Sequence, residues 1–167
     1  MNTNTTLINT ITDFLKEIGI GIEKEAIPET CFVPGIYLKN GKIIIDEPAL
    51  KYPGDILHEA GHLAVMPPKV RCTMSDSLPA TDLHKGGELM TLAWSYAASV
   101  HLGIDPCVVF HNDGYRGDSD YLLEHFTKNP KIGVNLLQWC EMAYDNSTAR
   151  QLNKQAYPTM QRWMREK

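Results

Sequence analysis

The sequence lacks the features by which several classes of protein are recognised. Its four cysteines include no Cys-x-x-Cys pair, so neither a structural zinc ribbon nor a redox dithiol is indicated. Free thiols in a chain without a disulfide framework are usually reduced and buried. We therefore expect reduced, mostly buried side chains at Cys31, Cys72, Cys107 and Cys140.

An excess of positive charge is also missing. Sixteen basic and twenty acidic residues give a net charge of −4, which is the wrong sign for general binding to a phosphate backbone. Basic residues near the C-terminus are spread along an amphipathic segment, which favours the exposed face of a helix over a binding patch. These residues are Arg150, Lys154, Arg162, Arg165 and Lys167. Nucleic acid is not expected as a partner.

No apolar run approaches the length of a membrane span, and the first residues lack the basic region and apolar stretch of a secretory signal. We therefore expect no membrane partner and a cytoplasmic location. The proportions of hydrophobic residues (43%) and charged residues (22%) are typical of globular proteins. With no internal repeat and no long linker, residues 1–167 are expected to form a single domain.

Hydrophobic spacing and turn residues predict an α+β fold that is mostly helical. Residues 36–39 and 42–45 flank Asn40-Gly41, whose tolerance of positive φ suits a two-residue type I′ hairpin turn. Helices are predicted over residues 4–18, 54–66, 88–102, 121–127, 134–144 and 158–166, and irregular segments over 69–85 and 111–120. Packing roles are expected for the aromatic residues Trp94, Tyr96, Trp139 and Trp163.

The segment His58-Glu59-Ala60-Gly61-His62 lies in the predicted helix 54–66. With His58 at the origin of a helical wheel, His62 falls at about 40° and Glu59 at about 100°, so the three side chains share one side. The opposite side is apolar and suits burial: Ile56, Leu57, Ala60, Leu63 and Ala64. The helix can therefore bury its apolar face in the core and direct its polar residues into a site.

This spacing is typical of a zinc site. Histidines four residues apart on a helix bring two imidazole nitrogens near one point, and neutral imidazole is a common zinc ligand. Glu59 lies beside the same point and can act as general base toward a water molecule activated by the metal. The three residues thus form half of a hydrolytic site, with a single zinc ion as the expected cofactor.

A strand at Ile43–Ile45 followed by this helix resembles the zincin metallopeptidases, in which the edge of the strand helps to align an extended substrate. A metzincin would have glycine at 65 and histidine at 68, where this chain has Val65 and Pro68. The pattern is therefore similar to the gluzincins, in which a glutamate on a second helix completes the site. The resemblance implies a minimal zincin-like fold and a peptide or protein substrate.

Glu88, at the predicted start of the second helix, is the expected third metal ligand. An acidic residue in a first helical turn can also serve only the helix dipole, so other candidates stay open. They are Asp82, His84, Cys72 and His111. His101 is expected to face away from the site, because it is rotated by about 220° from Glu88 on an ideal helix.

Two further expectations concern the surroundings of the metal. His111 or Tyr115, in the polar segment 111–120, could donate a hydrogen bond to the oxyanion that develops during amide hydrolysis. Gly61 costs the helix about 1 kcal/mol relative to alanine, which suggests close approach by another element, such as the helix of Glu88.

The leading functional hypothesis is a zinc metallopeptidase in which His58, His62 and Glu88 bind the metal and Glu59 is catalytic. One alternative is a zinc hydrolase of a small amide or ester, which would be favoured if segments 69–85 and 111–120 close the pocket to polymers. The other is a non-catalytic binding module whose metal is structural or absent. A fourth protein ligand would favour that module, because catalytic zinc keeps one position open.

Overall fold

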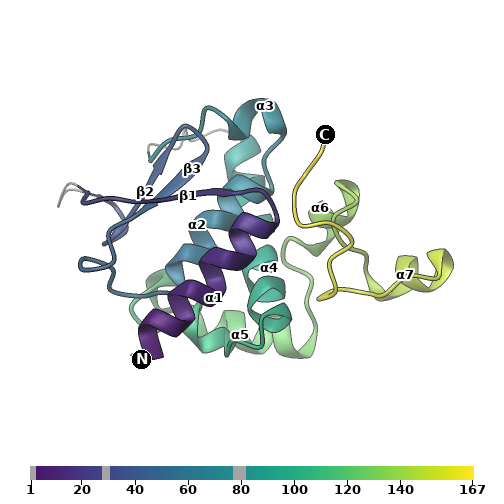
Figure 1. Ribbon diagram of the computed structural model, residues 1–167. Helices are drawn as coiled ribbons and strands as arrows, with labels where there is room; N and C mark the ends of the chain where they lie inside the picture. The colour runs from purple at the N-terminus through teal and green to yellow at the C-terminus, as the bar shows by residue number, and fades with distance from the viewer. Residues whose placement is uncertain (1–2, 28–30, 77–81) are drawn as a thin grey trace.

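The computed structural model of the protein describes residues 3–27, 31–76 and 82–167 (Figure 1). As the sequence predicts, the fold is α+β, with about 49% helix and a small three-stranded mixed sheet. The α-helices and strands of the described residues are, in chain order, α1 (Thr3–Glu17), β1 (Gly21–Lys24), β2 (Ile36–Lys39), β3 (Lys42–Ile45), α2 (Asp55–Ala64), α3 (Pro68–Arg71), α4 (Asp82–His101), α5 (Ser119–Lys128), α6 (Val134–Trp139) and α7 (Asn146–Leu152).

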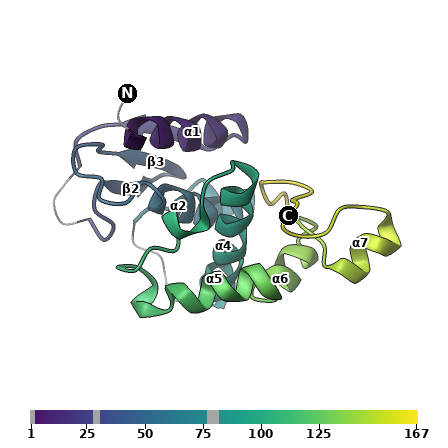
Figure 2. The same cartoon turned by 90° about the horizontal axis from the view of Figure 1, so that it is seen from below.

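The helices are arranged around the α2–α4 pair. Helix α1 lies on one side of this pair and α5 on the other, while α7 projects away from the rest of the molecule (Figures 1 and 2). In the described part of the chain, no helix has the length and apolar character needed to cross a membrane. The core is built from apolar faces of α1, the sheet, α2 and α4.

The predicted hairpin is confirmed. Strands β2 and β3 pair antiparallel, and Asn40 (φ 50°) and Gly41 (φ 74°) both have the positive φ that a type I′ turn requires. Strand β3 also pairs in parallel with β1, so it lies in the middle of the sheet order β1-β3-β2. The expectation that the edge of Ile43–Ile45 aligns a substrate is therefore wrong, because the edge strands of the sheet are β1 and β2.

Helix α2 presents the predicted apolar face to the core. All five residues of that face are fully buried: Ile56, Leu57, Ala60, Leu63 and Ala64. A Cβ added at Gly61 would lie 2.8 Å from Thr91 Cγ2 and 3.2 Å from Ser95 Oγ, and both of these residues belong to α4. The close approach expected at Gly61 is thus confirmed, and the approaching element is the helix of Glu88.

Helix α4 begins at Asp82, six residues before the predicted start at Glu88. The helix thus continues through Gly86-Gly87, although glycine disfavours a helix interior. A Cβ at Gly87 would lie 2.2 Å from Met66 Cε, so the glycine makes room for Met66 without ending the helix. Glu88 therefore lies in the second turn of α4, and the alternative that it only stabilises the first turn does not apply.

The C-terminal third differs most from the sequence prediction. The expected helix 158–166 is absent, α6 ends at Trp139, five residues before the predicted end, and α7 was not predicted. Trp163 instead packs against Phe14 and Trp94, with ring centroids 5.0 and 5.5 Å apart, and the Trp94 Nε1 donates to the Trp163 carbonyl at 2.8 Å. These tertiary contacts hold residues 158–166 in a non-helical course despite their helix-like spacing.

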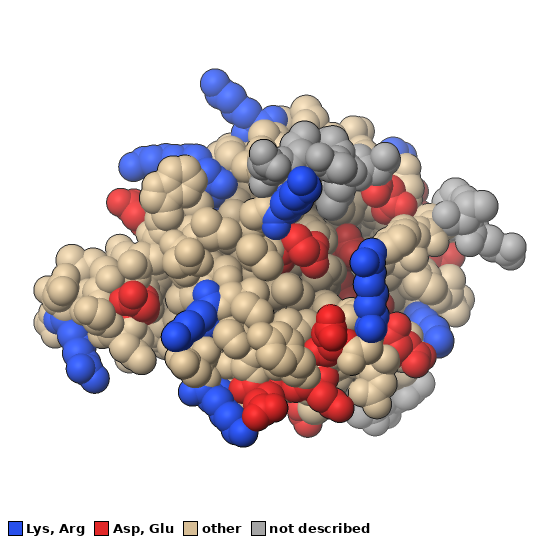
Figure 3. All heavy atoms as spheres, turned by 180° about the vertical axis from the view of Figure 1, so that it is seen from behind, with Lys and Arg blue, Asp and Glu red and all other residues tan. Residues whose placement is uncertain are grey.

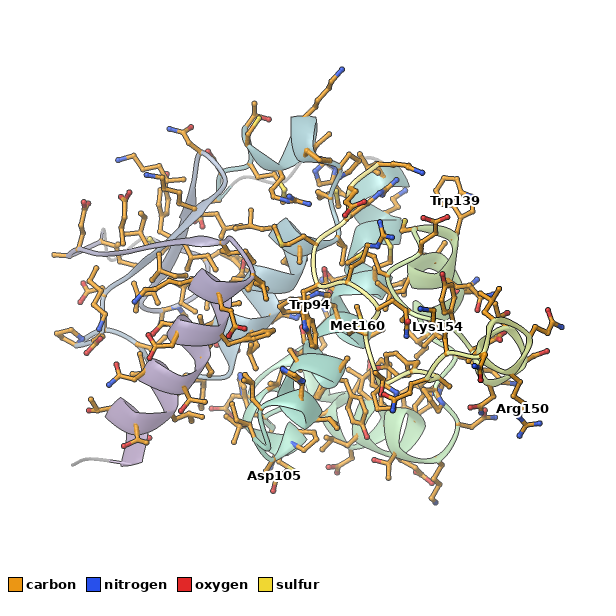
Figure 4. The ribbon with its side chains drawn as sticks, turned by 45° about the vertical axis from the view of Figure 1, so that its right-hand side comes forward. Trp94, Asp105, Trp139, Arg150, Lys154 and Met160 are labelled. Carbon is orange, nitrogen blue, oxygen red and sulfur yellow. The ribbon has the colours of Figure 1, made fainter. Side chains whose placement is uncertain are left out.

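Several burial predictions also need correction. Trp139 is 78% exposed and points outward from α6, whereas Trp94 is enclosed between α4 and the C-terminal segment (Figure 4). None of the cysteines is buried: Cys72 and Cys107 are exposed, and the other two are half-buried. The basic residues near the C-terminus do not share a helix face, since α7 includes only Arg150 among them. Periodicity alone could not distinguish these surfaces from the core.

Replacing Gly61 with alanine tests the contact between α2 and α4. Alanine favours a helix over glycine by about 1 kcal/mol, but overpacking a filled core costs about 1–3 kcal/mol. Because Thr91 is fully buried and β-branched, it has little freedom to move away from the new methyl group. We expect Gly61→Ala to lower the free energy of unfolding in urea by about 1 kcal/mol or more.

Gly86→Ala is the matched control, because a Cβ there meets only Leu136 Cδ1 at 3.9 Å, an ordinary contact. Because Gly86 lies in α4 and alanine favours a helix over glycine, Gly86→Ala should raise the free energy of unfolding by up to about 1 kcal/mol. If both substitutions raised the free energy of unfolding equally, α2 and α4 would be able to move apart at Gly61, and the expected overpacking would be refuted.

Candidate metal centre

Three polar side chains from α2 and α4 converge at one point. The Nε2 atoms of His58 and His62 are 3.2 Å apart, and Glu88 places Oε1 3.7 Å from the first and Oε2 3.4 Å from the second. Two ligands bound to zinc at about 2.0–2.1 Å in a tetrahedral arrangement lie about 3.3–3.4 Å apart. The observed separations of 3.2–3.7 Å are close to this value, although they involve both oxygens of Glu88, so the three residues could hold a metal ion of this size.

Both helices hold their ligands firmly. His62 is 7% exposed, and α2 buries its entire opposite face. The C-terminal end of α2 is capped by Arg71, whose guanidinium donates to the carbonyls of Leu63 (2.8 Å) and Met66 (2.9 Å). Glu88 projects from the adjoining turn of α4, and its side chain stays 47% exposed. The centre is therefore fixed on its histidine side and accessible on its carboxylate side.

Each histidine has a hydroxyl group at its second ring nitrogen. Tyr115 Oη lies 3.2 Å from His58 Nδ1, and Thr91 Oγ1 lies 3.4 Å from His62 Nδ1. A histidine that binds a metal through Nε2 carries its proton on Nδ1 and donates it to such a partner, which fixes the tautomer and the ring orientation. Sequence reasoning missed Thr91, although its place three residues after Glu88 puts both on one face of α4.

The environment keeps the two imidazoles neutral. Burial, with a smaller contribution from His62, lowers the pKa of His58 to about 3. Burial and then the nearby His84 lower the pKa of His62 to about 4. Neutral imidazoles have a free lone pair at neutral pH, which is the form that binds a metal. Partial burial raises the pKa of the Glu88 carboxyl, because a less polar environment disfavours its charged form.

Glu59 shares the cavity with these three residues. Burial raises its pKa to about 8, and the carboxylates of Asp55, Asp76 and Glu88 add to the shift. A cation bound between the histidines and Glu88 would oppose this shift, because an opposite charge nearby favours ionisation. The carboxyl group is thus placed where its protonation state responds to an occupied metal centre.

The site opens into a cavity of about 850 Å³. Seen from behind, acidic side chains gather around a hollow on the face opposite α1 (Figure 3). Besides the three converging residues, the cavity is lined by Phe32, Val33, Pro34, Leu38, Lys51, Tyr52, Asp55, Glu59, Asp76, His111, Asp113, Gly114, Tyr115 and Arg116. Phe32 is 92% exposed at this surface, so the lining combines an apolar residue with several carboxylates.

The segment 111–117 forms one wall and is bound closely to the start of α2. His111 Nε2 lies 2.9 Å from Asp55 Oδ1, and its ring stacks on Tyr52 with centroids 3.8 Å apart. Tyr115 (φ 53°) and the two residues after it have positive φ, an uncommon conformation that is often found at functional sites. Tyr115 points to His58 and His111 to Asp55, so oxyanion donation by either residue stays a prediction.

The other candidate ligands lie outside the converging group. Among the described residues, this group contains His58, His62 and Glu88, and neither His84 nor His111 belongs to it. Cys72 is exposed and donates to the Lys69 carbonyl, while the side chain of Asp82 lies outside the described residues. His101 packs against the rings of Phe14 and Trp163, away from the site as predicted.

Comparisons with known proteins complete the description of the site. The chain matches no protein-family model, no curated protein and no solved structure. The resemblance to zincins therefore depends on the residues of α2 and α4 themselves. What the structure adds is their convergence, in a group that could hold a metal ion.

Removing the Tyr115 hydroxyl tests its contact with His58. Tyr115→Phe keeps the ring that packs against Phe110 at 5.1 Å and loses only the hydrogen bond to His58 Nδ1. Loss of such a partner typically weakens metal binding by about 10–100-fold. We expect the zinc dissociation constant, measured by competition with a chelating dye, to rise about tenfold or more.

Tyr52→Phe is the control, because Tyr52 lines the same cavity but its hydroxyl donates to Asp113 instead of a converging histidine. Its zinc affinity should equal that of the unmodified chain. An unchanged affinity in Tyr115→Phe would show that the tyrosine does not orient His58.

Proposed function

We propose that this protein is a zinc-dependent hydrolase that cleaves a peptide or related amide bond. The observation that carries the proposal is the convergence of His58, His62 and Glu88, with ligand atoms 3.2–3.7 Å apart, in the cavity that also contains Glu59. Three protein ligands leave a fourth position open, which is the arrangement of catalytic zinc sites. The zincin resemblance of the His58–His62 segment supports the same reaction.

The donor set supports zinc as the metal. Two imidazole nitrogens and one carboxylate suit zinc, whereas calcium and magnesium prefer sites made of oxygen atoms only. When bound, zinc supplies a Lewis acid and lowers the pKa of a coordinated water to about 7. The chain's own residues then have to orient the ligands and move protons.

Glu59 is the proposed general base. Its carboxylate takes a proton from the attacking water and delivers the proton to the leaving nitrogen of the amide. Burial supports this role, because a carboxyl group with a raised pKa accepts a proton more readily than an exposed one. Tyr115 and Thr91 hold the two histidines in the required tautomer, and Asp55 orients His111 at the cavity wall.

Metal content is the first test of the proposal. Protein purified without added metal or a polyhistidine tag should contain about one zinc per chain by plasma mass spectrometry. His62→Ala and Glu88→Ala should each lose most of this zinc, because each removes one of three ligands. His101→Ala, which changes a histidine that packs against Phe14, should keep it. Zinc that survives Glu88→Ala would exclude the proposed third ligand.

The role of Glu59 requires a variant that separates catalysis from metal binding. Glu59→Gln preserves the size of the side chain but cannot accept the proton, so hydrolysis of a peptide library should fall by about 10²–10⁴-fold. Zinc content should stay at the level of the unmodified chain. A variant with full zinc and unchanged turnover would refute general-base catalysis by this residue.

A further inference from the structure

One wall of the metal cavity is the outer edge of β2, which contributes Leu38 to the lining. Strand β2 pairs with β3 on its inner side, so the groups that point outward could pair with another strand. Peptide substrates often bind in this way, because an added strand gains backbone hydrogen bonds along an exposed edge. Whether this edge is free therefore decides what kind of substrate can reach the metal.

The edge is already occupied. Both backbone groups of Leu38 bind Asp76: the amide donates to Asp76 Oδ1 (3.3 Å), and the carbonyl accepts from the Asp76 amide (3.1 Å). On either side, the Ile36 amide donates to the Val33 carbonyl (3.1 Å) and the Gly41 amide to the Met74 carbonyl (2.9 Å). The protein thus completes the edge of β2 with its own residues, and Asp76 does so inside the cavity.

The opposite wall is also braced. Segment 111–117 is connected to the start of α2 by His111 and Asp55, and its Asp113 receives hydrogen bonds from Lys51 (3.3 Å) and Tyr52. The cavity volume of about 850 Å³ lies within the range of small-molecule sites. Among residues 31–76 and 82–167, which the structure describes here, neither wall provides the row of free backbone groups that an extended chain requires.

We infer that the metal cavity accepts a compact amide, such as a derivative of one amino acid or a peptide of two or three residues, because Asp76 occupies the β2 edge. This inference rests on the proposed hydrolase function and restricts its substrate class. Such a substrate would be held by the metal, the exposed Phe32 and the polar groups of the lining. Residues beyond the first few would gain no strand pairing.

Peptide hydroxamates of increasing length test the inference without knowledge of the substrate. The full chain is loaded with cobalt(II), and binding of acetohydroxamate and of hydroxamates with one, two, four and six residues is followed by the visible spectrum of the metal. Pairing with a strand edge would strengthen binding by about threefold to tenfold for each added hydrogen bond. We expect the affinity to level off by two or three residues.

Two variants test whether Asp76 causes the affinity to level off. Asp76→Ala removes the side-chain acceptor at Leu38 and frees that amide, so the six-residue hydroxamate should bind about threefold or more tightly than to the unmodified chain. For each protein this affinity is divided by the affinity of acetohydroxamate, because Asp76 also acts on Glu59 and can change the binding of every hydroxamate. Ser75→Ala is the control, because it removes only the weak contact of Ser75 Oγ with the Asn40 amide (3.4 Å), at the turn of the hairpin.

The outcomes separate the substrate class from the function. An affinity that rises steadily from two to six residues in the unmodified chain would overturn the compact substrate and leave the hydrolase proposal intact. A cobalt spectrum that no hydroxamate changes would refute the open metal position itself, and with it both proposals. The inference would be supported if the hydroxamate affinity levels off by two or three residues in the unmodified chain but rises for the six-residue hydroxamate in Asp76→Ala.

Discussion

The separation between α2 and α4 determines whether the metal centre can exist. Gly61 allows α4 to approach until Thr91 and Ser95 fill the space that a side chain would take. The same approach places Glu88 Oε2 3.4 Å from Nε2 of His62 and Thr91 Oγ1 3.4 Å from Nδ1, the other nitrogen of that imidazole. The packing of α2 on α4 and the geometry of the site therefore depend on the same contact at Gly61. Glycine weakens the helix at this position, but it allows the ligands to converge.

Burial then sets the charges of the site. The histidines lose their affinity for protons because the interior disfavours their cationic forms, and the glutamates lose part of their acidity for the same reason. Burial thus favours neutral imidazoles and raises the pKa of both glutamates. A divalent ion bound among these residues would favour the ionised carboxylates, because an opposite charge nearby lowers their pKa. The imidazoles are already in the form that binds a metal, so the group could hold one without losing protons from its nitrogen ligands.

The sequence predicted the local elements near the site better than those far from it. The hairpin and α2 followed from Asn40-Gly41 and from the apolar face of the helix, because both patterns are determined by neighbouring residues. The start of α4 could not be predicted, since the space at Gly87 is filled by Met66, which lies in the connection between α2 and α3. The helix predicted over residues 158–166 is absent for a similar reason, because Trp163 packs against aromatic rings of α1 and α4.

The site itself shows the same limit. His58, Glu59 and His62 could be identified from spacing on one helix, and Glu88 from a resemblance. The partners Thr91, Asp55 and Asp76 could not, because their roles depend on how separate segments meet. A sequence motif specifies the ligands, whereas the residues that orient them and limit access appear only in three dimensions.

The cap on α2 has a consequence for the end of the chain. Arg71 connects the last carbonyls of α2 to the Arg165 carbonyl at 2.6 Å, and the Arg165 amide donates to Ala64 at 2.8 Å. These hydrogen bonds connect the segment around Arg165 directly to the helix that carries both histidines. By thermodynamic reciprocity, a ligand that rigidifies α2 would also hold this distant segment more tightly, and its protection from proteolysis would report the state of the centre.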